Sequence, residues 1–372
     1  MMPERLSTVE TSSALTTGRW SVGSAGNVRR GTVNDANVYS VIVNDRDSER
    51  FPVYPWPLRK PVEVFTSLCF ENFKTSGMRE IAFDCISTVS GNFGMPRSQV
   101  FSALWLLHVI AKGKDATITP ARWFGTEWPT VVSISYRPLR GIELKYSVTL
   151  QRIDEKRIRV IGERVEQGNE TILLRRKHSY ILAATKDKYG IGSSAFALYD
   201  AAHVLGGGNP IAELKRYLGD LWLLDPDPIR MKSEIVLDKI AADDPTFANL
   251  AACMVIQQQT NPSIAIAVTD AVRGVNPDIT GYSVGRNAKG IPFLAIHHRS
   301  DMDISGTPFG LIDNSEKILF LVAFVCTMNE RSAPIPAVWL SPFNWLGEQE
   351  RTAAERLVRT SFAKRGQMIM LV

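Results

Sequence analysis

The stretch Gly91-Asn92-Phe93-Gly94-Met95-Pro96-Arg97-Ser98 has the frame of a phosphate-binding loop with altered residues at its chemical positions. In the pattern G-x-x-x-x-G-K-[ST], the glycines permit tight backbone turns, the lysine reaches the phosphates and the hydroxyl binds Mg²⁺. Gly91 and Ser98 stand at the right spacing, whereas Pro96 replaces the second glycine and Arg97 replaces the lysine. Alone, this half-match is equally what a glycine-containing turn between a strand and a helix would show.

The flanking sequence places the loop between a strand and a helix. The β-rich run Pro61–Phe70 is followed by Glu71-Asn72-Phe73-Lys74, and a second apolar run, Ile81–Val89, leads directly into the loop. After the loop, apolar residues recur at helical spacing between Val100 and Ile110. A helix N-terminus offers unpaired N–H groups and a positive dipole end, both of which favour an anion. The setting therefore predicts an anion-binding turn.

This order of strand, E-N-F-K, strand, glycine loop and helix resembles the start of ABC-class ATPase heads of the RecF, OLD and structural-maintenance-of-chromosomes (SMC) type. Those heads carry A-L-x-x-L in the helix after the phosphate loop, which Ala103–Leu107 matches. The resemblance continues to about residue 372 through five collinear segments. These are an antiparallel meander over 130–136, 142–150, 157–165 and 171–176, a mostly helical part over 190–275, a signature-like segment Phe309–Lys317 before an apolar helix, a Walker B-like strand Ile335–Phe343, and helix Glu348–Phe362 with strand Gln367–Leu371.

The resemblance implies an α/β fold of the ABC-type ATPase head, with a P-loop-like α/β core, an antiparallel accessory sheet and a helical insert lobe. Because no long heptad array is present, the short OLD or RecF-like type is favoured over long coiled-coil arms. The implied domains are a poorly ordered extension and linker over 1–57, with one strand at Tyr39–Val43, the N-terminal half of the head over 58–185, the helical lobe over 186–285, and the C-terminal half over 286–372.

The departures from the family pattern fall at its chemical positions. With Pro342 aligned to the proline of D-E-P, the Mg²⁺-binding aspartate becomes Leu340 and the catalytic glutamate becomes Ser341. Without that carboxylate pair, the strand cannot hold the water shell of a metal or accept a proton from attacking water. In the signature-like residues Asp313, Asn314 and Ser315, asparagine stands where the family has glycine. We therefore assign no catalytic residue and no metal ligand.

The loop residues also depart from the family pattern, at Pro96 and Arg97. Guanidinium is a broad planar fork whereas ammonium is a compact point charge, so Arg97 is not equivalent to lysine in a narrow loop. Pro96 lacks an N–H group and fixes φ where glycine would leave it free. Anion binding could survive at the helix N-terminus, so the expected cofactor is either none or weakly bound ATP, without efficient hydrolysis. The candidate nucleotide-binding residues are Gly91, Gly94, Arg97 and Ser98.

The composition is that of a globular chain with 45% hydrophobic residues over 372 positions, enough for two or three domains. There is no apolar run of membrane-spanning length and no signal-peptide layout, so we expect a cytoplasmic protein without a membrane partner. The scattered cysteines stand in apolar contexts without C-x-x-C spacing, which predicts buried free thiols. They are Cys69, Cys85, Cys253 and Cys326.

Two further patterns each allow a structural and a functional interpretation. Basic clusters at Lys156–Arg159, at Arg175–His178 and on the C-terminal helix could contact DNA or RNA, although solvated faces are the favoured interpretation for a net charge of +5. His297-His298 with Asp301 and Asp303 could suggest a metal site. Adjacent side chains on a strand face opposite ways, which argues against it.

Three functions follow from these observations. The first is an inactive ATPase head that binds or scaffolds, as a homodimer or in a heteromeric complex, with an effector in genome defence or DNA processing. The second is a divergent ATP-binding protein or slow ATPase acting on DNA, with carboxylates from a partner or from Asp313, Glu316, Glu348 and Glu350. The third is a nucleic-acid-binding protein that ignores nucleotide. The genome-defence setting rests on family analogy alone.

Overall fold

The computed structural model describes residues 39–40, 63–72, 78–90, 97–113, 129–152, 158–176, 178–191, 196–235, 244–300, 306–332 and 334–372. All of these belong to one compact unit, residues 36–372. Of the predicted strand Tyr39–Val43, the structure describes β1 (Tyr39–Ser40), and the remainder lies outside the described residues, as does nearly all of the predicted extension.

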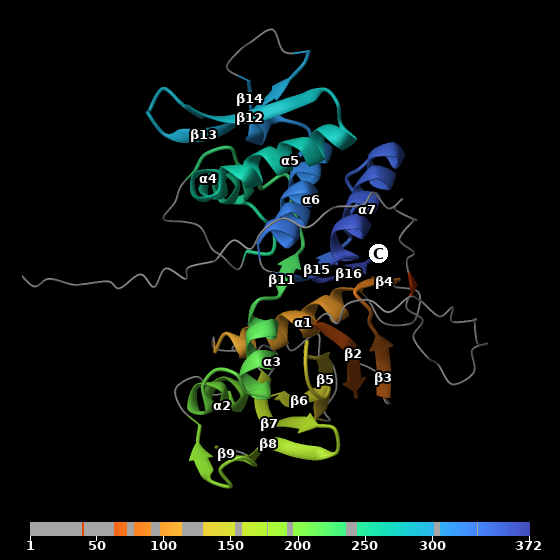
Figure 1. Cartoon of the computed structure of the whole chain (residues 1–372), viewed down its shortest axis with the longest axis vertical. Helices are drawn as coiled ribbons and strands as arrows, with labels where there is room; N and C mark the ends of the chain where they lie inside the picture. Colours follow the sequence, from red (N-terminus) through yellow and green to blue (C-terminus); the bar gives the residue numbers. More distant parts are fainter. Residues whose placement is uncertain are drawn as a thin grey trace, which may run out of the picture. The chain divides into compact units, whose positions relative to one another are not determined.

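A parallel sheet forms the centre of the unit (Figure 1). Its strand order is β1-β4-β16-β15-β11, and every neighbouring pair is parallel. Strands buried on both faces read as continuous apolar runs, and Pro-Ala-Val-Trp-Leu and Gln-Met-Ile-Met-Leu fit that rule. The strands are β4 (Ile86–Val89), β16 (Gln367–Leu371), β15 (Pro336–Leu340) and β11 (Trp222–Leu224).

Alternating residues of the central strands enter two separate cores. In β15, Val338 and Leu340 pack with helix α1 (Arg97–Ala111), whereas Trp339 packs in a core that contains α6 (Asn314–Arg331) and α7 (Glu348–Phe362). This follows from the period of two along a strand. Figure 1 shows α1 on one side of the strands and α6 with α7 on the other. The sheet is thus covered on both faces.

An antiparallel sheet of eight strands packs against the other face of α1, in the order β10-β9-β8-β7-β6-β5-β2-β3. Its inward positions alternate along each strand, and Val132, Ile134 and Tyr136 of β5 are fully buried. The predicted meander is confirmed as β5–β8. The strands are β2 (Val64–Glu71), β3 (Met78–Ala82), β5 (Thr130–Arg137), β6 (Leu144–Arg152), β7 (Ile158–Gln167), β8 (Glu170–Arg176), β9 (Ser179–Leu182) and β10 (Lys188–Gly190).

The prediction of one continuous run over Ile81–Val89 is wrong. The chain leaves the antiparallel sheet after β3 and enters the parallel sheet at β4. Asp84 makes the turn between them: its backbone N–H donates to Ser87 Oγ at 2.8 Å, and its carboxylate accepts from Cys85 N at 2.7 Å. These local bonds compete with strand pairing and allow the chain to change sheets.

The segment over 190–275 is mostly helical, as predicted, but it also contains a strand. Three apolar residues after α3 form β11 and pair with β15. A small third sheet follows, in the order β12-β13-β14. The elements are α2 (Ala197–Leu205), α3 (Pro210–Gly219), α4 (Leu250–Thr260), α5 (Pro262–Val275), β12 (Ile279–Arg286), β13 (Pro292–His298) and β14 (Thr307–Pro308).

The chain therefore has the predicted mixed α/β architecture, with one parallel sheet and two antiparallel sheets among the described residues. The parallel sheet takes β4 from the first predicted half of the head, β11 from the predicted helical lobe, and β15 and β16 from the last segment. The domain boundaries at 57, 185 and 285 stay predictions. No helix among the described residues combines the length and apolarity that crossing a membrane requires.

Candidate functional site

The candidate site lies where the parallel strands end and α1 begins. Arg97 is the first residue of α1, and its Nη1 donates to Ser341 Oγ at 3.3 Å. Ser341 directly follows β15. Two residues far apart in sequence, one from the predicted loop and one from the predicted Walker B-like segment, are thus in contact. Ligands of open α/β sheets bind outside the carboxyl ends of the strands, so this is where a nucleotide would be expected.

The backbone at Ser341 is held in an uncommon conformation. Its φ is +52°, in the left-handed region that non-glycine residues rarely adopt. The Ser341 N–H donates to Leu371 O at 2.8 Å, which continues the pairing of β15 with β16 into the turn. The turn therefore fixes the hydroxyl that accepts from Arg97.

Leu340, the predicted counterpart of the family's Mg²⁺-binding aspartate, packs against the apolar core. Its side chain is half-buried and packs with the core that contains α1. Leu340 and Ser341 together therefore present one apolar group and one hydroxyl, and neither is a carboxylate that could bind a metal ion strongly. Among the described residues, no group of three or more His, Cys, Asp and Glu side chains is placed to hold a metal ion.

The remaining loop residues divide between described and undescribed parts of the chain. Ser98 is exposed on the first turn of α1, and its carbonyl accepts a hydrogen bond from Ser102 Oγ. Gly91 and Gly94 lie outside the described residues. The assignment of all four residues to a nucleotide site stays a prediction.

The signature-like residues begin helix α6. Asp313 is the residue before the helix, and Asn314 and Ser315 are its first two residues. Glu316, in the same turn, accepts from His298 Nε2 at 3.0 Å, which attaches the start of α6 to β13. This turn of α6 is therefore held by the third sheet.

Lys317, the last residue of the signature-like segment, makes contacts that the sequence did not predict. It is buried, and its Nζ donates to Pro228 O at 3.2 Å and to Gly310 O at 3.0 Å. Burial lowers the pKa of Lys317, and the charge of Asp313 opposes that shift. The sequence does contain a signal for these contacts: a lysine at the start of an apolar helix cannot remain both buried and unpaired.

The ammonium of Lys317 holds two chain segments that each present an aliphatic side chain to solvent. Ile229 follows Pro228 and is 73% exposed, and Leu311 follows Gly310 and is 77% exposed. Isolated surface aliphatics are common, but these two lie on segments joined by one buried cation. We call Ile229 and Leu311 the aliphatic pair.

The basic cluster at 175–178 needs a correction. Arg175 is 8% exposed, and its Nη1 donates to the buried Glu163 carboxylate at 2.7 Å. It therefore belongs neither to a solvated face nor to a phosphate-binding surface. The rest of the charge pattern is untested.

The histidine pair and the cysteines behave as adjacent strand residues and apolar-context thiols should. His297 contacts Ser283 Oγ at 2.8 Å, whereas His298 contacts Glu316, so the two rings have different partners. Asp301 and Asp303 lie outside the described residues. All four cysteines are free thiols. Cys253 is only partly buried, which corrects the prediction of a buried thiol at that position.

No protein-family model and no curated protein sequence matches this chain. Solved structures do. The head of an Smc protein bound to the C-winged helix domain of ScpA shares 14% identity over 83% of this chain and 89% of its own, with a TM-score of 0.48. An Smc head with an extended coiled coil, bound to the C-terminal domain of ScpA derived from Pyrococcus furiosus, shares 13% identity over 83% and 89%, with a TM-score of 0.46. The SMC head domain from Thermotoga maritima shares 11% identity over 82% and 88%, with a TM-score of 0.41. The chain is thus distantly similar in fold to SMC heads.

Proposed function

We propose that this chain is a catalytically inactive ATPase head of the ABC type that works as a binding or scaffolding subunit. The observation that carries the proposal is the hydrogen bond from Arg97 to Ser341. Arg97, the cation of the predicted loop, donates to Ser341, which stands at the predicted position of the catalytic carboxylate. The neighbouring Leu340 packs against the core. Phosphoryl transfer relies on a positioned metal and charge stabilisation, and these residues supply neither metal ligand nor general base.

Calorimetric titration with Mg²⁺ and ATP tests this proposal. We expect a dissociation constant weaker than about 1 mM, which corresponds to less than about 4 kcal/mol of binding free energy. We also expect no hydrolysis above the protein-free rate, and no change on Arg97→Ala. The exposed Arg140 between β5 and β6 provides a matched control, Arg140→Ala. Micromolar ATP binding that is lost in Arg97→Ala and kept in Arg140→Ala would contradict the proposal.

One observation favours a second function. Arg97 and the exposed Ser98 begin a helix of fifteen residues, whose N-terminus favours an anion. A divergent ATP-binding protein or slow ATPase acting on DNA would use them to hold phosphate, with carboxylates supplied by a partner. This alternative expects micromolar ATP binding that is lost in Arg97→Ala and kept in Arg140→Ala.

The aliphatic pair supports a protein partner, and we propose a second copy of this chain as the first candidate. Burial of a leucine-sized side chain contributes about 1.5–3 kcal/mol. Two such side chains on segments fixed by Lys317 offer an ordered contact that costs little further ordering on binding. The family resemblance is the basis for proposing two further partners: an effector in genome defence or DNA processing, and DNA or RNA.

Replacing Leu311 with glutamate is expected to weaken this self-association by roughly 10-fold or more, because an apolar contact is lost and a charge is desolvated. Sedimentation velocity over a concentration series measures the change. Met78→Glu is the matched control, because Met78 is 70% exposed on the distant β3. A wild-type chain that stays monomeric throughout the series, or equal weakening by both variants, would exclude the aliphatic pair as the self-association surface.

A further inference from the structure

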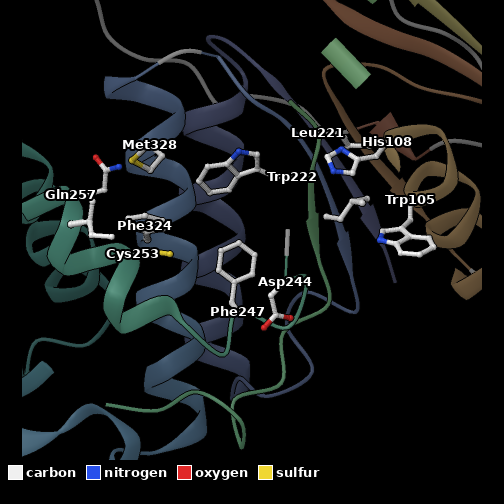
Figure 2. Close-up of a pocket in the computed structure, with 12 residues that line it drawn as sticks. Trp105, His108, Leu221, Trp222, Asp244, Phe247, Cys253, Gln257, Phe324 and Met328 are labelled. Carbon is white, nitrogen blue, oxygen red and sulfur yellow. The ribbon is translucent and has the colours of Figure 1, made fainter. Parts of the chain in front are cut away.

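A cavity of about 270 Å³ lies at the edge strand β11 (Figure 2). Neither Arg97 nor Ser341 is among its lining residues. Helix α1 contributes Trp105 to one side, and α6 contributes Phe324 to the other. Trp222 of β11 lies between them, and Phe247 closes a further wall. Elements from three distant parts of the sequence therefore build this cavity.

The walls of the cavity are mainly aromatic and aliphatic. The rings of Trp222 and Phe247 are 6.2 Å apart between centroids, as are those of Trp222 and Phe324. Trp222, Phe247 and Trp105 are each only partly buried, so their faces are not fully covered by other protein atoms. Aromatic faces carry negative potential and attract cations as well as apolar groups.

One carboxylate, that of Asp244, lies at the edge of this apolar surrounding (Figure 2). Asp244 Oδ1 accepts from Thr246 N at 3.0 Å and from Thr246 Oγ1 at 2.7 Å, which fixes the orientation of the carboxyl group. Among the described residues that line the cavity, Asp244 is the only carboxylate, and neither lysine nor arginine is present. The cavity therefore combines π-faces with one fixed negative charge.

The size limits the ligand. An apolar cavity of roughly 150 Å³ holds benzene, so a cavity of about 270 Å³ accommodates one aromatic ring with a short chain. Most ligand pockets are of about 300 Å³ or more, and a nucleotide would bring several negative charges to a site whose fixed charge is negative. The cavity thus selects against the ligand class expected at α1.

We propose that this cavity binds a small organic cation with one aromatic or branched apolar group, with its ammonium on Asp244 and its apolar part among Trp105, Trp222 and Phe247. Charge complementarity at Asp244 and the aromatic walls select this class over neutral or anionic molecules. The neighbouring Cys253 thiol is not a competing anion, because burial raises its pKa to about 11 and leaves it neutral at pH 7.

Calorimetry with three probes of similar size tests the proposal on the whole chain: 2-phenylethylamine, 2-phenylethanol and 3-phenylpropionate. We expect binding in the order cation, neutral alcohol, anion. Asp244→Asn should weaken the amine about tenfold or more and leave the alcohol nearly unchanged, since the amide oxygen still accepts from Thr246. Quenching of tryptophan fluorescence by the amine, reduced in Trp222→Phe, locates the probe.

Two variants separate a local effect from a general one. Asp225→Asn removes an exposed charge from the residue whose N–H donates to Pro245 O, beside the cavity but outside its lining, and should not change amine binding. Cys253→Leu fills part of the cavity and should weaken all three probes. The proposal is overturned by no amine binding up to millimolar concentration, by equal binding of amine and propionate, or by an Asp244→Asn variant that binds amine like the wild type.

Discussion

Replacing Glu163 with alanine is expected to lower the free energy of unfolding by about 3–5 kcal/mol, the usual loss when one partner of a buried ion pair is removed. Glu163 is 2% exposed in β7, and its carboxylate has four hydrogen-bond donors. Arg175 Nη1 and Ala197 N donate to Oε1 at 2.7 Å, Tyr146 OH donates to Oε2 at 2.8 Å, and Leu198 N donates to Oε2 at 3.0 Å.

The four bonds join β7 to three other elements, β6, β8 and α2, through one side chain. The N–H groups of Ala197 and Leu198 are the first two of α2 and have no partner within the helix, so the carboxylate caps the helix and interacts favourably with its dipole. Tyr146 is fully buried, and burial together with the charge of Glu163 raises its pKa well above the usual value. With alanine at 163, the Arg175 guanidinium, a hydroxyl and two N–H groups lose the carboxylate together, and Arg175 keeps its bond to Val160 O at 3.1 Å.

Glu166 on the same strand provides the matched control. It pairs with Arg164 at 2.5 Å, but both side chains are accessible, at 26% and 50%. Exposed pairs of this kind contribute about 0–1 kcal/mol. Urea unfolding followed by circular dichroism should therefore separate Glu163→Ala from Glu166→Ala by at least about 2 kcal/mol. Equal midpoints would show that the Glu163 network does not stabilise the fold.

A double variant tells the ion pair from the helix cap. Replacing both Glu163 and Arg175 by leucine and methionine removes the stranded charge, and for the pair alone such changes are often neutral. The two N–H groups of α2 would still lack an acceptor. We expect the double variant to recover part of the loss and to remain about 1–2 kcal/mol below the wild type. Full recovery would assign the whole effect to the charge of Arg175.

Sequence reasoning located elements well where local signals were strong. The predicted helix Glu348–Phe362 and strand Gln367–Leu371 coincide with α7 and β16. The helix begins where Gly347 N donates to Glu350 Oε2 at 3.2 Å, which is half of a capping box and visible in sequence. Such signals involve residues a few positions apart in the chain, so the local sequence can reveal them.

Features that depend on distant partners were missed. The three residues of β11 form a strand because β15 lies beside them, and three apolar residues between helices carry no local strand signal. Arg175 appeared in a basic cluster, and only the fold shows that Glu163 neutralises it. At the candidate site, family motifs assigned Arg97 to the loop and Ser341 to the Walker B-like segment, but nothing in the sequence predicted the hydrogen bond between them.

Replacing Gln367 with methionine is expected to lower the free energy of unfolding by about 3 kcal/mol or more, because three side-chain bonds to the backbone, two of them buried, are lost at once. Gln367 is fully buried at the start of β16. Its Oε1 accepts from Phe65 N at 2.9 Å, and its Nε2 donates to Phe65 O at 2.7 Å and to Asp84 O at 3.0 Å. The amide thus bonds β2 of the antiparallel sheet from a strand of the parallel one.

The register of β2 explains why an amide is needed there. Pairing between β2 and β3 reaches Ser67 with Ala82, so Phe65 lies beyond that end of the ladder. The Gln367 amide offers one acceptor and one donor to Phe65, as a neighbouring strand would. Methionine has nearly the same shape but neither hydrogen-bonding group, and the buried N–H and C=O groups of Phe65 would be left without this partner.

Gln151→Met is the matched control, because Gln151 is exposed and its amide accepts from Arg159 Nη2 at 3.1 Å. Surface substitutions of this kind change stability by about 0.5 kcal/mol or less. Hydrogen exchange gives a second measurement: the Phe65 amide should lose protection in Gln367→Met, whereas the amide of Ile134 in the middle of β5 should follow only global stability. If the Phe65 amide kept its wild-type protection, the two sheets would be joined by something other than this side chain. Because β16 also accepts the Ser341 N–H at Leu371, loosening of this join should reach the candidate site as well.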